Sequence, residues 1–160
     1  MYKKNRLLLV CLAALFAAVP FGCGSRDAVP SVGENEIKLK IQLDLKEEIG
    51  LLLIDHSVNG TRGMGGMSNA DKSMLRCDDV LYWDFDKTLY ELDGMVDSVD
   101  LTVRFTVVTA YFDPNYDNLY PKEFMVPMEA LSFRAAFGNL YRITIRGDRT
   151  EGYRAVLESA

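Results

Sequence analysis

Oxygen-bearing side chains occupy alternate positions in the segment DPNYD, residues 113–117 of the 160-residue chain. Asp113, Asn115 and Asp117 could offer carboxylate and amide oxygens to Ca²⁺, as the first half of a calcium-binding loop does. The sixth position of such a loop would be Asn118 in place of glycine, and the twelfth would be Phe124 in place of glutamate. The alternative is a turn in which these side chains bond to their own backbone. Calcium is therefore a candidate cofactor.

A second pair of carboxylates follows the apolar and aromatic stretch that begins at Val80. The run VLYWDFDKTL resembles the first motif of haloacid-dehalogenase-type phosphatases, an apolar strand followed by Asp-x-Asp-x-Thr-Leu. The resemblance implies that Asp84 attacks phosphorus, that Asp86 protonates the leaving group, and that Mg²⁺ lies between them. Extended along the chain, it would assign the remaining phosphate- and metal-binding groups to Thr109, Lys122, Asp148 and Glu151.

That family needs a parallel sheet covered by helices, and each crossover between parallel strands takes a dozen or more residues. The chain between Asp84 and Asp148 instead alternates between polar and apolar residues, contains three prolines and has no amphipathic helix. The alternative is an antiparallel strand on which the two aspartates face solvent while Trp83 and Phe85 are buried. We expect this second arrangement.

Sulfur and aromatic side chains gather in two turn-rich segments. Met64 and Met67 lie in a glycine-rich segment near His56, and thioether and imidazole groups suit copper. No second histidine is available to complete such a site. Tyr116 and Tyr120 lie in a segment rich in aspartate and asparagine, and exposed loop aromatics often contact partners. We take these two methionines and two tyrosines as a candidate contact surface, the alternative being that the tyrosines cap the hydrophobic core.

The N-terminus has the layout of a secretory signal peptide: a basic start, an apolar run over residues 7–21, and a cluster of small residues. The pair Gly22-Cys23 at the end of this run resembles the lipobox of bacterial lipoproteins, although the two preceding residues differ from the usual pattern. The resemblance implies that residues 1–22 are removed and that Cys23 carries the lipid that holds the protein to a membrane of the cell envelope. Secretion as a soluble protein is the alternative.

The charge balance excludes one class of partner. The chain has 18 Lys and Arg against 23 Asp and Glu, and loss of the three cations in residues 1–22 leaves 15 against 23, a net charge of −8. Nucleic acids require a surplus of cations on one face, so we expect no nucleic-acid partner. Two cysteines remain after removal of the leader. If Cys23 is acylated, Cys77 has no partner and is expected to be buried; otherwise the two could form a disulfide.

Strict polar–apolar alternation over residues 37–45 and 99–107 predicts two strands, each with one buried and one wet face. Further strands are expected at 49–58, 80–85, 122–128, 140–145 and 153–157. The first two strands should pair as antiparallel neighbours. Residues 59–73 should form a long loop, and residues 128–137 at most one or two helical turns.

These elements predict an all-β fold: a single antiparallel β-sandwich, immunoglobulin-like or related, of about seven strands over residues 37–160, behind a flexible tether at 23–36. With no convincing catalytic set, we expect a non-catalytic binding domain that meets an envelope protein or a glycan. One alternative is a magnesium-dependent phosphohydrolase that uses Asp84 and Asp86. Another is a structural subunit that offers a strand edge near residues 122–128 to a partner.

Overall fold

The computed structural model describes residues 30–92, 96–110 and 122–158. The contacts divide the chain into residues 1–30 and a compact unit that begins at Ser31 and holds all the described strands. Within the described residues no helix is long and apolar enough to cross a membrane.

The described part of the chain contains nine strands and two short 3₁₀-helices, so the all-β prediction is confirmed and the expected number of strands, seven, was too low. The elements are β1 (Glu36–Leu45), β2 (Leu51–Val58), β3 (Thr61–Met67), β4 (Val80–Asp86), η1 (Lys87–Tyr90), β5 (Ser98–Val108), η2 (Lys122–Phe124), β6 (Met125–Pro127), β7 (Leu131–Ala136), β8 (Leu140–Asp148) and β9 (Gly152–Leu157).

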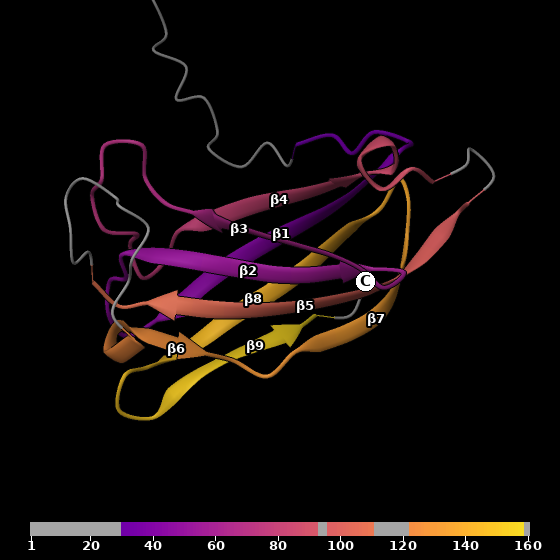
Figure 1. Ribbon diagram of the computed structural model, residues 1–160. Coiled ribbons are helices and arrows are strands. Elements are labelled where there is room, and N and C mark those ends of the chain that lie inside the picture. Colours follow the sequence, from indigo (N-terminus) through magenta and orange to yellow (C-terminus); the bar gives the residue numbers. More distant parts are fainter. Residues whose placement is uncertain (1–29, 93–95, 111–121, 159–160) are drawn as a thin grey trace, which may run out of the picture. The chain divides into compact units, whose positions relative to one another are not determined.

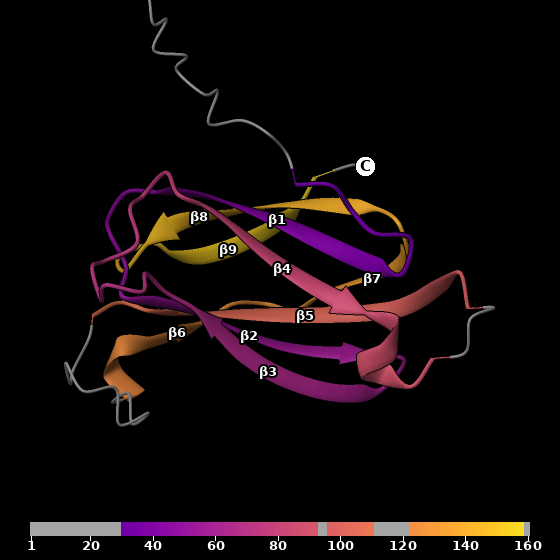
Figure 2. The same ribbon diagram turned by 90° about the horizontal axis from the view of Figure 1, so that it is seen from above.

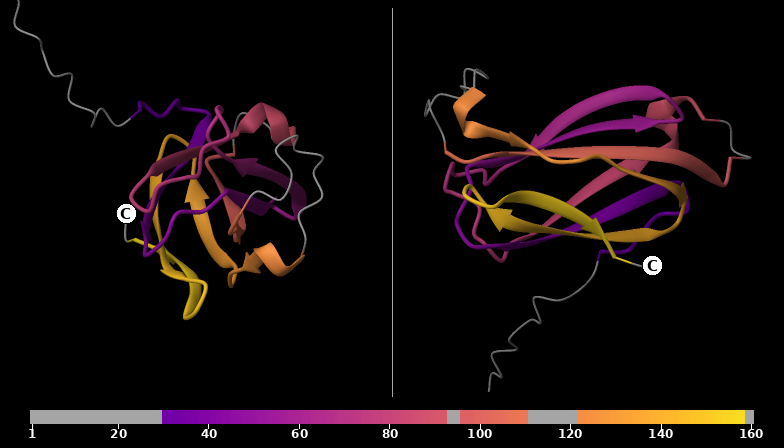
Figure 3. Two further views of the ribbon diagram at one scale, coloured as in Figure 1. Left: turned by 90° about the vertical axis from the view of Figure 1, so that its left-hand side faces the viewer. Right: turned by 90° about the horizontal axis from the view of Figure 1, so that it is seen from below.

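The strands form two sheets that pack face to face as a sandwich (Figures 1 and 2). The four-stranded sheet has the order β4-β1-β8-β9, and the five-stranded sheet has the order β3-β2-β5-β6, with β7 also paired to β5. The two layers are also visible in the right-hand view of Figure 3. All pairs are antiparallel except β1 with β8, which is parallel, so the expectation of a purely antiparallel sandwich was wrong at this pair.

The first two strands do not pair with each other, contrary to the sequence prediction. β1 lies between β4 and β8 in one sheet, whereas β2 lies between β3 and β5 in the other. Both edges of β1 are therefore occupied, and the short segment after Leu45 carries the chain from one sheet to the other. Short connections favour hairpins, but β4 and β8 occupy both edges of β1, so β2 cannot pair with it.

The expected loop at residues 59–73 is for the most part a hairpin and a strand. Asn59 and Gly60 have φ angles of 48° and 90°, the left-handed conformations that a two-residue hairpin turn requires. The chain then returns as β3, paired with β2 from Thr61 opposite Val58 to Met67 opposite Leu52. The glycine content of this segment concealed a strand.

The core lies between the two sheets and is built from the alternating residues that the sequence predicted. On β1 and β5 every second side chain is buried, and these strands supply Ile37, Leu39, Ile41, Leu43, Leu45, Val99, Leu101, Val103, Phe105 and Val107. Burial of each such aliphatic or aromatic side chain contributes roughly 1.5–3 kcal/mol. The intervening side chains of β1 and β5, most of them polar, point away from the core.

The C-terminal part combines one correct and one incorrect prediction. The closing hairpin is present as β8 and β9, and the edge strand expected near residues 122–128 is present as the short β6. The segment expected to hold a helical turn contains β7, which pairs with the first half of β5. β6 and β7 thus follow one edge of β5 in succession, with Met128 donating to the Phe105 carbonyl between them.

Candidate functional site

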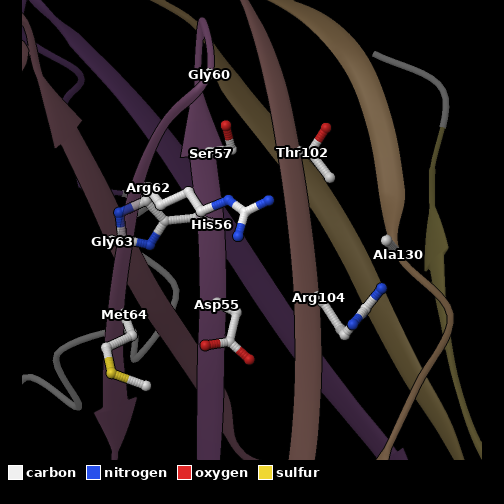
Figure 4. Close-up of a pocket in the computed structure, with 10 residues that line it drawn as sticks. All are labelled: Asp55, His56, Ser57, Gly60, Arg62, Gly63, Met64, Thr102, Arg104 and Ala130. Carbon is white, nitrogen blue, oxygen red and sulfur yellow. The ribbon is translucent and has the colours of Figure 1, made fainter.

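An open hollow of about 680 Å³ lies on the outer face of the five-stranded sheet (Figure 4). It spans β3, β2 and β5 and reaches the segment before β7. Six of its ten lining residues have polar side chains; the full set is Asp55, His56, Ser57, Gly60, Arg62, Gly63, Met64, Thr102, Arg104 and Ala130. Because the side chains of a strand alternate between faces, Asp55 and Ser57 point outward from β2 while His56 points toward the core.

Two rows of side chains cross the floor of the hollow. In one row Asp55 of β2 stands between Met64 of β3 and Arg104 of β5. In the next row Ser57 stands between Arg62 and Thr102. The Thr102 hydroxyl lies 2.9 Å from that of Ser132 on β7, which extends the row of hydroxyl groups.

The two arginines of the hollow have no ion pair or side-chain hydrogen bond to any other described residue. In Figure 4 the Arg62 side chain crosses over β2 toward β5, and Arg104 extends from β5 toward Ala130. By contrast Arg134, on the same face, is held by Asp100 at 3.2 Å. The two guanidinium groups alone offer ten N–H donors to the hollow, and the hydroxyl groups can add more. Asp55 supplies its one carboxylate acceptor.

His56, which also lines the hollow, is partly buried on the core side of β2. Its ring lies edge-on to Phe85, with centroids 5.1 Å apart, and its Nε2 lies 2.8 Å from the Tyr90 hydroxyl. The buried Nδ1 has no hydrogen-bond partner, so one ring nitrogen is unsatisfied in either tautomer. Burial lowers the pKa of His56 below its ordinary value of 6.5, an effect that the charge of Asp55 opposes.

Two glycines of β3 make this packing possible. Gly63 lies opposite His56, and a Cβ atom at Gly63 would run into the Nε2 end of that ring. A Cβ at Gly65 would run into the Trp83 ring, which reaches across from β4 in the other sheet. The glycines therefore provide the room in which an imidazole and an indole lie against the strand backbone.

Two of the four candidate contact residues, Met64 and Met67, lie in the described part of the chain. Met64 is 79% exposed and lines the hollow, whereas Met67 is partly buried and packs against the core. Cys77 is exposed, which corrects the expectation that it would be buried. Cys23, the calcium candidates Asp113, Asn115 and Asp117, and the tyrosines Tyr116 and Tyr120 lie outside the described residues.

The residues of the phosphatase resemblance are not brought together. Asp84 lies 3.3 Å from Lys38, and Asp86 caps η1 by accepting hydrogen bonds from Thr88, which lower the pKa of Asp86. The register places Asp84 level with Leu140, and Asp148 lies eight residues further along β8. Eight residues of strand span about 26 Å. Asp148 is instead paired with Lys46 at 3.2 Å.

Metal ligands do not cluster in the described ranges, where no group of three His, Cys, Asp or Glu side chains is placed to hold an ion. His56, the only histidine in the sequence, packs against the rings of Trp83, Phe85 and Tyr90. The chemistry that this face offers is therefore hydrogen bonding and charge pairing by Arg62, Arg104, Asp55 and the neighbouring hydroxyl groups.

Comparison with known proteins assigns no family. No protein-family model matches the sequence, and no curated protein matches it. Among solved structures, a protein from Eubacterium rectale studied by NMR is 12% identical, with a TM-score of 0.42 over 82% of this chain and 97% of that chain. A disulfide-locked mutant of intermedilysin with human CD59 is 8% identical, with a TM-score of 0.39 over 78% of this chain and 24% of that chain.

Sequence reasoning missed the hollow because its residues come from three strands. Asp55, Arg62 and Arg104 are separated by up to 49 positions, and one of them lies in a segment that was expected to be a loop. One signal was available: on the solvent-facing side of the strand expected at 99–107, Arg104 lies between two threonines, and all three side chains can donate hydrogen bonds to a ligand.

Proposed function

We propose that this chain is an envelope lipoprotein, anchored by lipid on Cys23, whose sandwich domain binds an acidic glycan in the hollow and carries out no reaction on it. The observation that carries the ligand class is the pair of guanidinium groups, Arg62 and Arg104, that lack any described partner. Guanidinium groups pair with carboxylate or sulfate oxygens through two parallel hydrogen bonds.

The rest of the hollow suits the hydroxyl groups of a sugar. Ser57 and Thr102 can donate or accept hydrogen bonds, and the Asp55 carboxylate can accept them. The hollow is open along the sheet, which fits one stretch of an extended chain better than a small ligand that must be enclosed. Met64, with 79% of its surface exposed, offers an apolar contact at the rim.

The anchor is supported by the leader and by Gly22-Cys23, which resemble the export signal and cleavage site of bacterial lipoproteins. Expression of the full chain in a bacterium, followed by mass measurement of the mature protein, tests this step. A species that starts at Cys23 with added acyl mass is expected, and Cys23→Ser should lack that mass. An unmodified soluble species that starts at Ser25 would contradict the anchor.

An array of acidic and neutral oligosaccharides tests the ligand class. The mature chain should retain acidic members over neutral members of the same length, and Arg62→Ser or Arg104→Ser should each weaken retention about tenfold or more, since a hydrogen bond to a charged group contributes about 1.5–3 kcal/mol. Arg134→Ser is the matched control, because it removes a cation from the same face that is already paired with Asp100. Equal retention of neutral sugars, or an equal loss in Arg134→Ser, would refute the proposal.

A further inference from the structure

The outer edge of β3 is a second unassigned surface, at one side of the five-stranded sheet. Within the described residues β3 pairs only with β2, so its other edge carries backbone groups that no described strand meets. We propose that two copies of this chain pair through this edge to form a homodimer. The two β3 strands run antiparallel about a two-fold axis that passes beside Met64.

The hydrogen bonds of β2 show which residues of β3 face the free edge. Asn59, directly after β2, donates to the Asp100 carbonyl oxygen on the β5 side at 2.9 Å. Backbone groups of a strand point to alternate sides, so the even-numbered residues of β2 turn toward β3. Their partners are the odd-numbered residues of β3, from Thr61 to Met67. The N–H and C=O groups of the remaining residues therefore point to the free edge: Arg62, Met64 and Gly66.

These three residues form an edge with little protection. All three are exposed, and Met64 has the highest exposed fraction among the large apolar side chains that the structure describes. Edge strands are usually protected by prolines, charged side chains or a covering segment. β3 contains no proline and one charged residue, Arg62. A second strand therefore meets few of the usual obstacles here.

The other edges of the two sheets are less suited to a second strand. Leu43 of β1 donates to the Asp79 carbonyl oxygen, so the even-numbered residues of β4 face its free edge, among them the acids Asp84 and Asp86. β9 lies against β6 and β7. β6 is only three residues long and ends in Pro127, which has no N–H to donate.

The edge of β3 is complementary to itself. When Met64 lies opposite Met64 of the second copy, Arg62 lies opposite Gly66 of the second copy, and the reverse pair forms as well. Each facing pair exchanges two backbone hydrogen bonds, so the three pairs give six. No like charges face each other, and the arginine is opposite a residue without a side chain. The exposed Met64 side chains meet at the axis and remove apolar surface from water.

The inner side of the joint and the size of the joined sheet also permit this pairing. Between the bonded pairs, Gly63 lies opposite Gly65 of the second copy, so no side chains collide on the inner face. β6 and β7 share one edge of β5, so the five-stranded sheet is four positions wide and two copies give eight. Twisted open sheets rarely exceed about ten strands. The dimer places both hollows on one continuous face, where a single extended ligand can contact them together.

Cysteine cross-linking tests the register directly. The full chain is expressed with Cys11, Cys23 and Cys77 changed to serine, so an introduced thiol is the only one. With copper phenanthroline as oxidant, Met64→Cys should give a disulfide-linked dimer, because the paired Cα atoms lie about 5.5 Å apart and a disulfide spans about 4.4–6.8 Å. Arg62→Cys alone is the control for random collision, since its two copies lie about 14 Å apart in the dimer. A mixture of Arg62→Cys and Gly66→Cys should cross-link.

Proline at the axis tests the backbone bonds. Met64→Pro removes an N–H that points to the free edge and leaves the bonds to β2 intact, so the domain should fold with an unchanged circular dichroism spectrum. Two interchain hydrogen bonds are lost, each changing the equilibrium about fivefold, so the dissociation constant from sedimentation equilibrium should rise about 25-fold. Tyr82→Pro, at an edge-facing position of β4, is the matched control and should leave the constant unchanged.

Three results would overturn the homodimer. They are a protein that stays monomeric at every concentration measured, cross-linking of Arg62→Cys alone as efficient as that of Met64→Cys, and equal weakening by the two proline variants. If Met64→Pro fails to fold, the cross-linking pattern decides. These measurements involve neither a glycan nor a lipid, so their failure leaves the proposed function untouched, and failure of the glycan array leaves the homodimer untouched.

Discussion

The close approach of Trp83 to β3 yields a quantitative prediction about Gly65. A Cβ atom at this position would lie closer than 3.0 Å to Cη2 of the indole and 3.2 Å from Cζ2 and Cζ3, whereas carbon atoms in contact prefer about 3.5–4.0 Å. The ring has little room to withdraw because it packs against His56, with centroids 6.0 Å apart. Gly65→Ala should therefore lower the free energy of unfolding by about 1–3 kcal/mol, the usual cost of overpacking.

Gly66→Ala is the matched control on the opposite face of the same strand. Its Cβ would lie 3.1–3.2 Å from the ends of the Leu51 and Leu53 side chains, which can rotate away. The alanine also restricts the unfolded chain, so this variant should be neutral or more stable by up to about 1 kcal/mol. Thermal and urea unfolding measure both, with Gly65→Ala lowering Tm by about 3–10 °C for a domain of this size.

Replacing Trp83 by the smaller phenylalanine should reduce the loss of stability caused by Gly65→Ala. In a double-mutant cycle with Trp83→Phe, Gly65→Ala should cost at least about 1 kcal/mol less than it does beside tryptophan, because the atoms that it meets are gone. Equal costs in the two backgrounds, or equal melting of Gly65→Ala and Gly66→Ala, would show that the indole does not fill the space above Gly65 and would refute the packing described here.

Three further predictions concern the backbone, protonation and the thiol. Gly147→Ala should lower the free energy of unfolding by about 2–4 kcal/mol, because Gly147 has a φ of 119° and an added Cβ would also collide with the backbone of Gly152. Gly138→Ala, at a φ of 80° with no atom near the added Cβ, should lower it by only about 1 kcal/mol; chemical denaturation measures both. The lowered pKa of His56 means that the unfolded chain binds the extra proton first, so stability should fall as pH decreases from 7 to 5.5, and His56→Gln should remove that slope. The exposed Cys77 should react stoichiometrically with a thiol reagent in the native protein, and a reaction that waits for denaturant would contradict its exposure.

Alternation of polar and apolar residues was sufficient to predict the two central strands. Along β1 and β5 the buried side chains follow a period of two, because each strand has one face on the core and one in water. The same pattern gave the all-β class and the closing hairpin. It could not give the pairing of β1, whose neighbours β4 and β8 start about 40 and 100 residues later, since a pattern within one strand carries no information on its partner.

β3 and the hollow escaped prediction for related reasons. Glycine usually marks a break, and Gly63 and Gly65 are compatible with a strand only because His56 and Trp83 occupy the space where their side chains would be. His56 and Trp83 lie on β2 and β4, so the sequence of β3 alone gives no sign of these contacts. The hollow depends in turn on β3, since it places Arg62 beside β2.

The parallel pairing of β1 with β8 has a consequence for how the chain reaches its native state. Lys38 must find Leu140, 102 residues away, and pairings of such long sequence separation slow the search for the native topology. Until the segment that begins at Leu140 is present, β1 keeps an open hydrogen-bonding edge. The four-stranded sheet therefore cannot be completed before β8 is available, and a truncation before Leu140 should yield a species that aggregates through that edge.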